Sequence, residues 1–295
     1  MESDIPVKPN FFIVGTPKSG TTSLFRYLEE HPEIFVPHLK EPHFFSFPEV
    51  SDTYYNTKIV STARQYQELF ANATSYKAVG DLSSSYLYNH KAASRIKKFS
   101  PDAKIIIVLR NPVERAVSHY LMDRNLGYIK TPLMEVLSNK EQYPKFFEQY
   151  YGVGEYKKQL ERYTGLFEKQ QVLILMSDEL FSDPRAVLTR IFSFLEVDNT
   201  FQPDFSKKYN EYKEPRFKIV NRFKNSKTLR WIFDRLPGSF QKIASKTAFD
   251  ESREKPSLMA EKDLLQNWYS DEIQELEQLL DRDLSSWKQT SKTGE

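Results

Sequence analysis

The chain has 295 residues, of which 39% are hydrophobic and 28% charged, and its formal net charge is only +2. This composition is typical of a folded globular protein, and the absence of cysteine excludes disulfides and thiolate metal sites. No stretch approaches the ~20 apolar residues of a membrane span, and the polar segment 1–10 lacks the pattern of a signal peptide, so we expect a soluble, cytoplasmic protein.

Short apolar runs then alternate with segments of helical periodicity over the first two hundred residues. Strands are predicted at 11–14, 34–36, 77–80, 104–109 and 172–176, and helices at 22–30, 64–71, 91–99, 112–124, 154–167 and 184–195. Such alternation predicts an α/β domain with a central parallel sheet and helices on both faces. Ligands of these sheets bind beyond the carboxyl ends of the strands.

The strand signal fades after about residue 201. Residues 207–255 hold 14 lysines and arginines against 6 acidic residues, so this block carries +8 and the remainder sums to −6. Such a block attracts anions, although a solvated helical surface has the same composition. We interpret 207–256 as an irregular basic lid on a single domain spanning 1–295. A final amphipathic packing helix is predicted at 271–280.

The first apolar run leads into Gly-Thr-Pro-Lys-Ser-Gly-Thr-Thr-Ser, residues 15–23, which is nearly a Walker A loop. Gly15 and Gly20 have the required spacing, but Thr21 stands where a nucleotide triphosphatase carries its lysine, and the lysine lies inside the loop as Lys18. Loop amides and a helix N-terminus form an anion site. The alternative is a turn that merely starts a helix. The order of strand, loop and helix favours a P-loop-containing fold that binds a phosphate-bearing nucleotide.

A second motif, Leu-Arg-Asn-Pro-Val-Glu-Arg-Ala-Val-Ser at 109–118, follows the clearest buried strand. Arg110 stands directly at the end of that strand, Pro112 suits a first helical position, and Ser118 lies about two turns into the helix. Arg110 and Ser118 could clamp a second phosphate, and a helix-cap turn with Arg110 in a salt bridge is the alternative. A magnesium-dependent triphosphatase usually ends such a strand with an aspartate instead.

The two motifs together resemble the paired donor-binding motifs of the sulfotransferase family, whose members use 3′-phosphoadenosine-5′-phosphosulfate (PAPS). The resemblance implies a 5′-phosphosulfate loop formed by Lys18, Ser19, Gly20, Thr21, Thr22 and Ser23. It also implies a 3′-phosphate site formed by Arg110 and Ser118. The similarity spans most of the chain and is weakest from about 201 to 256, where Arg253 and Lys255 are candidates for a basic loop over the donor.

Lys-Glu-Pro-His-Phe-Phe at 40–45 resembles a segment of the carbohydrate branch of that family, whose enzymes act on heparan-type glycans. The resemblance implies that Glu41 is the base that takes the acceptor proton. An aromatic pocket would raise the pKa of Glu41, and the alternative is a surface carboxylate paired with Lys40. His43 is the rival base, a substrate contact or a buried ring.

Gly-Asp-Leu-Ser-Ser-Ser-Tyr at 80–86 resembles the Gly-Glu-x-x-Pro-x-Tyr segment of the family. It departs at Leu82, where some glycan enzymes carry a catalytic lysine, and at Ser84, which replaces the proline. These departures weaken the argument for a heparan-type acceptor.

We therefore expect in-line transfer of a sulfuryl group from PAPS to a hydroxyl or amine of a glycan or small molecule, with Glu41 and Lys18 catalytic and no metal. The main alternative is a P-loop kinase that uses ATP and Mg²⁺. A second alternative is a non-catalytic binder of anionic glycans or nucleic acid through 207–255, although we expect no nucleic-acid partner. The sequence carries no indication of the oligomeric state.

Overall fold

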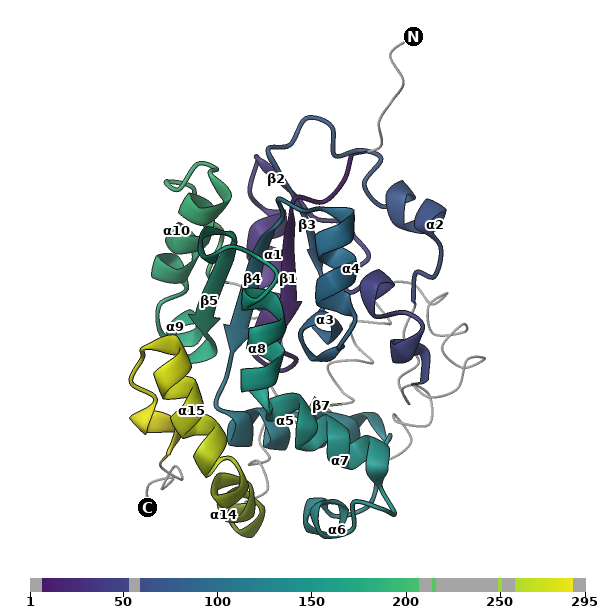
Figure 1. Ribbon diagram of the computed structural model, residues 1–295, viewed down its shortest axis with the longest axis vertical. Coiled ribbons are helices and arrows are strands. Elements are labelled where there is room, and N and C mark those ends of the chain that lie inside the picture. Colours follow the sequence, from purple (N-terminus) through teal and green to yellow (C-terminus); the bar gives the residue numbers. More distant parts are fainter. Residues whose placement is uncertain (1–6, 53–58, 207–213, 216–248, 251–257, 289–295) are drawn as a thin grey trace.

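The computed structural model describes residues 7–52, 59–206, 214–215, 249–250 and 258–288 (Figure 1). Apart from 214–215 and 249–250, the basic block at 207–256 lies outside the described residues, and so do Arg253 and Lys255. Within this block, β6 (Glu214–Pro215) and β7 (Phe249–Asp250) pair as two short antiparallel strands.

A five-stranded parallel sheet forms the centre of the described structure, in the order β2-β3-β1-β4-β5 (Figure 1). Its strands are β1 (Phe11–Gly15), β2 (Ile34–Phe35), β3 (Ala78–Leu82), β4 (Lys104–Leu109) and β5 (Val172–Met176). All of β1 and β3 is buried, as is β4 beyond its first residue. Continuous apolar runs are typical of strands covered on both faces. The prediction of an α/β fold with a parallel sheet is confirmed.

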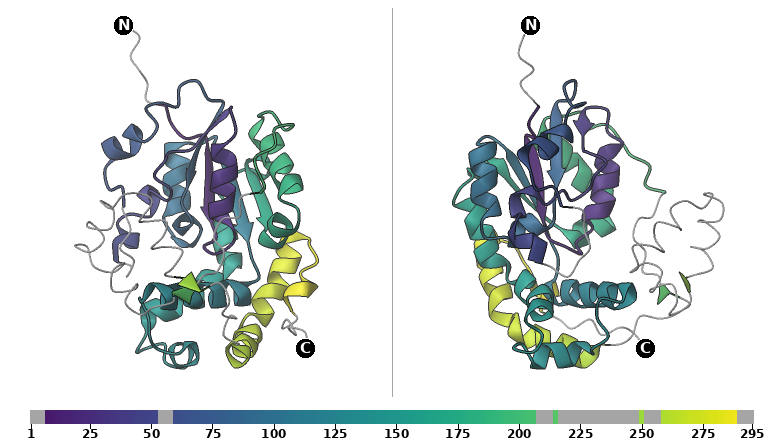
Figure 2. Two further views of the ribbon diagram at one scale, coloured as in Figure 1. Left: turned by 180° about the vertical axis from the view of Figure 1, so that it is seen from behind. Right: turned by 90° about the vertical axis from the view of Figure 1, so that its right-hand side faces the viewer.

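Helices cover both faces of this sheet (Figures 1 and 2). On one face lie α1 (Thr21–Glu29) and α10 (Pro184–Leu195), whose leucines and phenylalanines share one apolar cluster. On the other face lie α3 (Ser85–Tyr88), α4 (Ala92–Phe99) and α8 (Tyr156–Thr164). No helix among the described ranges is long and apolar enough to cross a membrane.

The remaining helices include α5, which crosses below the carboxyl ends of the strands in Figure 1. Their bounds are α2 (Ala63–Glu68), α5 (Pro112–Leu126), α6 (Leu133–Ser138), α7 (Pro144–Tyr150), α9 (Ser177–Ser182), α14 (Met259–Trp268) and α15 (Ser270–Leu280). Within the described ranges, the short 3-10 turns are η1 (Phe44–Ser46), η2 (Glu49–Asp52), η3 (Gly152–Gly154), η4 (Lys169–Gln171) and η5 (Ser285–Trp287).

The predicted strands and helices are all present, with boundaries shifted by a few residues. The helix expected at 154–167 is shorter, because the 3-10 turn η3 occupies 152–154 and α8 begins only at Tyr156. The short helices α3, α6, α7 and α9 were missed, and so was α14. Most of these span one or two turns, too short for an apolar periodicity to be recognised.

Buried Arg115 joins α5 to the end of α7. Its guanidinium donates to the backbone oxygens of Gln149 at 2.9 Å and Tyr150 at 2.6 Å, and it also contacts His119 at 3.1 Å. The Tyr269 hydroxyl, at the junction of α14 and α15, donates to Tyr151 O at 2.5 Å. These bonds join α5, which carries most of the second motif, to the end of α7, and they join the α14–α15 junction to the residue that follows α7.

Gly80 on β3 packs directly against Phe11 on β1, and a Cβ at position 80 would overlap the phenylalanine ring. We predict that Gly80→Ala lowers the free energy of unfolding by about 1–3 kcal/mol, because overpacking forces the sheet or the ring to shift. Urea unfolding measures this cost. The double variant Gly80→Ala, Phe11→Leu should cost less than the sum of its single changes. Full additivity would contradict the assigned contact.

Candidate functional site

The phosphate-type loop follows β1 at residues 16–20. The pairing of β1 with β4 shifts register between Ile13 and Gly15, where the chain leaves the sheet. The loop ends at Gly20, which precedes α1 with a left-handed φ of 90°. A Cβ at Gly20 would lie 3.0 Å from side-chain carbons of both Leu180 and Phe181, which would have to shift slightly, and the left-handed φ itself favours glycine.

The amides of this loop are available to an anion. Among the described residues, no acceptor is bonded to the backbone N–H groups of 18–23, and no side chain caps α1. The Ser19 hydroxyl turns inward and donates to Thr16 O at 2.5 Å, whereas Thr21, Thr22 and Ser23 form the first turn of α1. Unpaired amides at a helix N-terminus bind phosphate and sulfate groups.

The second motif meets this loop directly. Since β4 lies beside β1, Arg110 emerges next to the loop, and its Nη1 donates to Lys18 O at 2.8 Å. The guanidinium also lies 5.9 Å from the centre of the Phe181 ring, which is 55% exposed. Ser118 is half-buried on α5, and the structure gives no contact between Ser118 and Arg110 among the described side chains.

Lys18 extends from the loop toward α5, where its Nζ lies 3.2 Å from Met122 Sδ. Burial lowers the pKa of Lys18 from 10.5 to about 8. The charge of buried Asp123 opposes this change, and the cations Arg110 and Arg115 reinforce it. Burial therefore destabilises the charged form of Lys18, and an anion bound in the loop would stabilise that form.

Glu41 and His43 lie on the segment between β2 and η1. Both have left-handed φ angles, 60° and 57°, which side chains with a Cβ rarely adopt. Glu41 N donates to Leu82 O at 3.0 Å, and His43 N donates to Ser83 Oγ at 3.2 Å. The carboxyl end of β3 thus holds both predicted bases in place.

The Glu41 carboxylate accepts two hydrogen bonds at the same oxygen, from Lys40 Nζ at 2.8 Å and Ser84 Oγ at 3.0 Å. Burial alone would raise the pKa of Glu41, but the charges of Lys40 and His43 and these hydrogen bonds hold it below its ordinary value. The expectation of a raised pKa was therefore wrong, because the neighbouring cation and hydroxyl outweigh desolvation. The pairing with Lys40 that we considered as an alternative is present.

His43 is almost fully buried and lies between two groups. Its Nδ1 is 2.8 Å from Ser85 Oγ, and its Nε2 is 3.7 Å from Glu41 Oε2. Burial lowers the pKa of His43, against the opposing charge of Glu41, so the ring is neutral near pH 7. The two rival bases of the sequence analysis therefore face each other in one site.

Asp81 on β3 is an acidic residue whose role the sequence analysis missed. An aspartate was expected only at the end of β4, but β3 also borders β1. Asp81 is buried and accepts hydrogen bonds from Tyr66 at 2.7 Å, Tyr86 at 2.8 Å and Ser83 at 2.9 Å. Burial raises the pKa of Asp81 to about 6. Across the described segments, no three His, Asp or Glu side chains are grouped to hold a metal ion.

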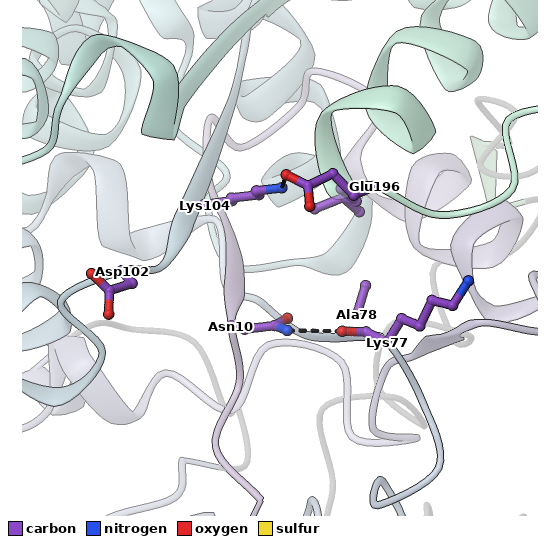
Figure 3. Close-up of a pocket in the computed structure, with 7 residues that line it drawn as sticks. Asn10, Lys77, Ala78, Asp102, Lys104 and Glu196 are labelled. Atoms are coloured by element: carbon purple, nitrogen blue, oxygen red, sulfur yellow. Dashed lines mark hydrogen bonds and ion pairs between the residues drawn. The ribbon is translucent and has the colours of Figure 1, made fainter.

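Two open hollows of about 480 Å³ each lie elsewhere on the surface. One lies at the carboxyl end of β5, beside Asp178 and Trp287. The other lies at the opposite edge of the sheet, where Lys104 pairs with Glu196 at 2.6 Å and Asn10 donates to Lys77 O at 2.9 Å (Figure 3). The cations of this second hollow are far from the phosphate-type loop in the fold.

A parallel sheet with two phosphate-type motifs at its carboxyl edge defines an α/β nucleotide-binding protein of the P-loop type. The sequence profile of the sulfotransferase domain family matches residues 8–270, and the chain belongs to this family. Members of the family use PAPS as the sulfate donor.

The relatives agree with this membership. Human heparan sulfate glucosamine 3-O-sulfotransferase 3B1 is 30% identical over 190 residues, which cover 63% of this chain and 46% of that protein. The membrane-associated sulfotransferase kil1 of Dictyostelium discoideum is 34% identical over 120 residues, covering 41% of this chain and 24% of its own length. The chain thus spans less than half of these relatives.

Among solved structures, a sulfotransferase from Alicyclobacillus acidocaldarius is similar along nearly the entire chain. It is 30% identical with a TM-score of 0.73, and the match covers 96% of this chain and 100% of that one. The sulfotransferase domain from the curacin biosynthetic pathway, 16% identical with a TM-score of 0.50, shares the fold.

The low pKa of Lys18 predicts a measurable effect on stability. The unfolded chain holds the lysine proton up to about pH 10.5 and the folded chain only up to about pH 8, so stability should rise as the pH increases between these values. Lys18→Met should therefore raise the free energy of unfolding at pH 7 by about 1–3 kcal/mol and flatten this rise. Urea unfolding at pH 7 and pH 9.5 measures both effects. Exposed Lys98→Met is the matched control, and a destabilised Lys18→Met at pH 7 would contradict the assigned burial.

Proposed function

We propose that this chain transfers a sulfuryl group from PAPS to a hydroxyl or amine of an acceptor, and that the acceptor is a glycan. The observation that carries the proposal is the hydrogen bond from Arg110 to Lys18 O, which brings two phosphate-type motifs to one edge of the sheet. A donor with phosphates on both the 3′ and 5′ positions of its ribose needs two such groups side by side. The third component is the Glu41 and His43 pair beside β3.

In this proposal, the loop amides and the hydroxyls of Thr21, Thr22 and Ser23 bind the 5′-phosphosulfate, with Gly20 allowing close approach of the backbone. Arg110 and Ser118 bind the 3′-phosphate and so fix the register of the donor. The fit rests on the unpaired amides of 18–23 in the described structure and on the cations beside them.

The acceptor attacks sulfur as Glu41 takes its proton. A carboxylate with a lowered pKa is ionised at neutral pH, and proton transfer becomes favourable as the bond from the acceptor to sulfur forms. Lys18 neutralises charge on the departing phosphate oxygen. Catalysis then depends on positioning and electrostatic stabilisation, and no step is assigned to a covalent intermediate or a metal.

The kinase alternative is less well supported. Thr21 replaces the lysine of a Walker A loop, and Arg110 stands at the end of β4. Asp81 on β3 has a suitable place beside β1, but its two oxygens already accept three hydroxyl hydrogen bonds. A magnesium ion would have to displace them.

The choice of a glycan rests on the relatives whose names specify heparan sulfate. Four expectations stay predictions. They are a single domain over 1–295, a lid at 207–256, a donor contact by Arg253 or Lys255, and a cytoplasmic location.

We predict that 3′-phosphoadenosine-5′-phosphate (PAP) binds without magnesium, that ATP with magnesium binds far more weakly, and that Arg110→Ala weakens PAP binding by about 10- to 100-fold. The loss corresponds to a charge-assisted contact with phosphate. Ser118→Ala should cost several-fold. Isothermal titration calorimetry measures these affinities.

Adenosine 5′-phosphate, which lacks the 3′-phosphate, separates the assigned roles. Arg110→Ala should weaken the binding of this nucleotide much less than that of PAP, because only the contact of Arg110 with the loop at Lys18 O is then lost, and exposed Arg64→Ala should not change the affinity for either ligand. Equal losses for both nucleotides in Arg110→Ala would overturn the assignment of Arg110 to the 3′-phosphate.

We further predict that Glu41→Gln reduces sulfate transfer by about 10²-fold or more while PAP affinity is unchanged, because the amide cannot take a proton. Transfer of ³⁵S from labelled PAPS to heparan sulfate measures the rate. Glu68→Gln, at an exposed position on α2, is the control. An active Glu41→Gln variant would remove Glu41 from the mechanism, and a wild-type protein that binds PAP but leaves heparan sulfate unlabelled would remove this acceptor.

A further inference from the structure

Three consecutive serines after β3 contact the segment that carries the two bases. Ser83 Oγ accepts from the backbone of His43 at 3.2 Å, and Ser84 Oγ donates to Glu41 Oε1 at 3.0 Å. Ser85 Oγ lies 2.8 Å from the His43 ring. Each hydroxyl therefore holds a different group of the same site, and the contact of Ser85 bears directly on the protonation of the ring.

The donor and the acceptor of each hydrogen bond around Ser85 can be assigned in turn, starting from the carbonyl oxygen of His43. Ser46 Oγ donates to His43 O at 3.1 Å, since a carbonyl oxygen only accepts. Ser85 Oγ is 2.8 Å from Ser46 Oγ, and because each hydroxyl has one hydrogen, Ser85 donates to Ser46. Ser85 then has no hydrogen for His43 Nδ1, so Nδ1 carries the hydrogen and donates to Ser85. Neutral His43 is left with a free lone pair on Nε2.

This lone pair faces a second acceptor. His43 Nε2 lies 3.7 Å from Glu41 Oε2, whereas the hydrogen bonds that Lys40 and Ser84 give to the carboxylate both reach Oε1. The lone pairs of this nitrogen and this oxygen repel each other unless a group that donates a hydrogen bond lies between them. The hydroxyl or amine of an acceptor substrate supplies such a hydrogen.

We propose that Glu41 Oε2 and His43 Nε2 act as one proton-accepting pair, and that Ser85 and Ser46 are positioning residues that keep Nε2 unprotonated. This inference rests on the proposed sulfuryl transfer. In the reaction, the bond from the acceptor atom to sulfur forms, the bond from sulfur to the phosphate oxygen breaks, and PAP leaves. The proton of the nucleophile goes to the pair, where it is shared between the oxygen and the nitrogen.

The charged groups around His43 are consistent with this assignment. The charge of Glu41 raises the pKa of the ring, and the charge of Lys40 lowers it. Buried Asp81 accepts a hydrogen bond from Ser83. Burial keeps the free ring neutral, so its nitrogen is available as an acceptor until the nucleophile arrives.

The tautomer of His43 tests the proposal without donor or acceptor. Long-range ¹H–¹⁵N spectra of the histidine-labelled protein at pH 7.5 report which ring nitrogen carries hydrogen, and His43→Gln identifies the signal among the five histidines. We expect the Nδ1–H form in the wild type. Ser46→Ala should switch it to the Nε2–H form, because the freed hydrogen of Ser85 then goes to Nδ1. A wild-type signal in the Nε2–H form overturns the proposal.

Transfer kinetics give the second measurement. Ser46→Ala and Ser85→Ala should each lower the rate of ³⁵S transfer by about 10-fold with PAP affinity unchanged, and Ser85→Thr should restore it because the hydroxyl is retained. Exposed Ser94→Ala, whose hydroxyl donates to the backbone oxygen of Lys91 just before α4, is the control. A Ser46→Ala variant that keeps both the Nδ1–H form and the wild-type rate overturns the proposal. The spectra remain informative even if the chain transfers no sulfate, so the two proposals fail separately.

Discussion

The adjacency of β1 and β4 is the constraint on which the rest of the site depends. The strands run parallel, so the turns that follow them emerge at the same edge, and the Arg110 guanidinium can reach the backbone oxygen of Lys18. Motifs about ninety residues apart in the chain thereby become neighbours. Without that pairing, the loop would be a single anion site, and nothing in the fold would distinguish a donor with two separated phosphate groups.

Much of this arrangement could be predicted from the sequence. Apolar strands, the glycine loop and the Arg-Asn-Pro turn are local patterns, and the order of strands and helices implies their common edge. The lowered pKa of Glu41 could not be predicted, because it depends on how the fold brings Lys40, His43 and Ser84 around the carboxylate. Asp81 was overlooked for a similar reason: only the strand order places β3 beside β1. The pKa of a side chain depends on the groups that the fold places around it, and a sequence motif does not show these groups.

The segment with Glu41 and His43 shows how the fold maintains an unfavourable local conformation. Two left-handed residues cost energy, which the surrounding structure must offset. Hydrogen bonds from Glu41 N to Leu82 O and from His43 N to Ser83 Oγ join the segment to β3, and Phe45 packs in the core beneath it. Ser83 and Ser84, the latter at the position of the family's proline, therefore contribute structure as well as polarity to this segment.

Helix α5 carries both Ser118 and Met122, which are four residues apart and so share one face of the helix. A single residue inserted between Asn111 and Met122 would rotate everything after it by about 100°. The Met122 thioether would then turn away from Lys18, and an insertion before Ser118 would turn the Ser118 side chain away as well. This stretch should consequently show almost no change in length across natural homologues, and a count of insertions and deletions along the chain would reveal the spacing that the proposed donor site requires.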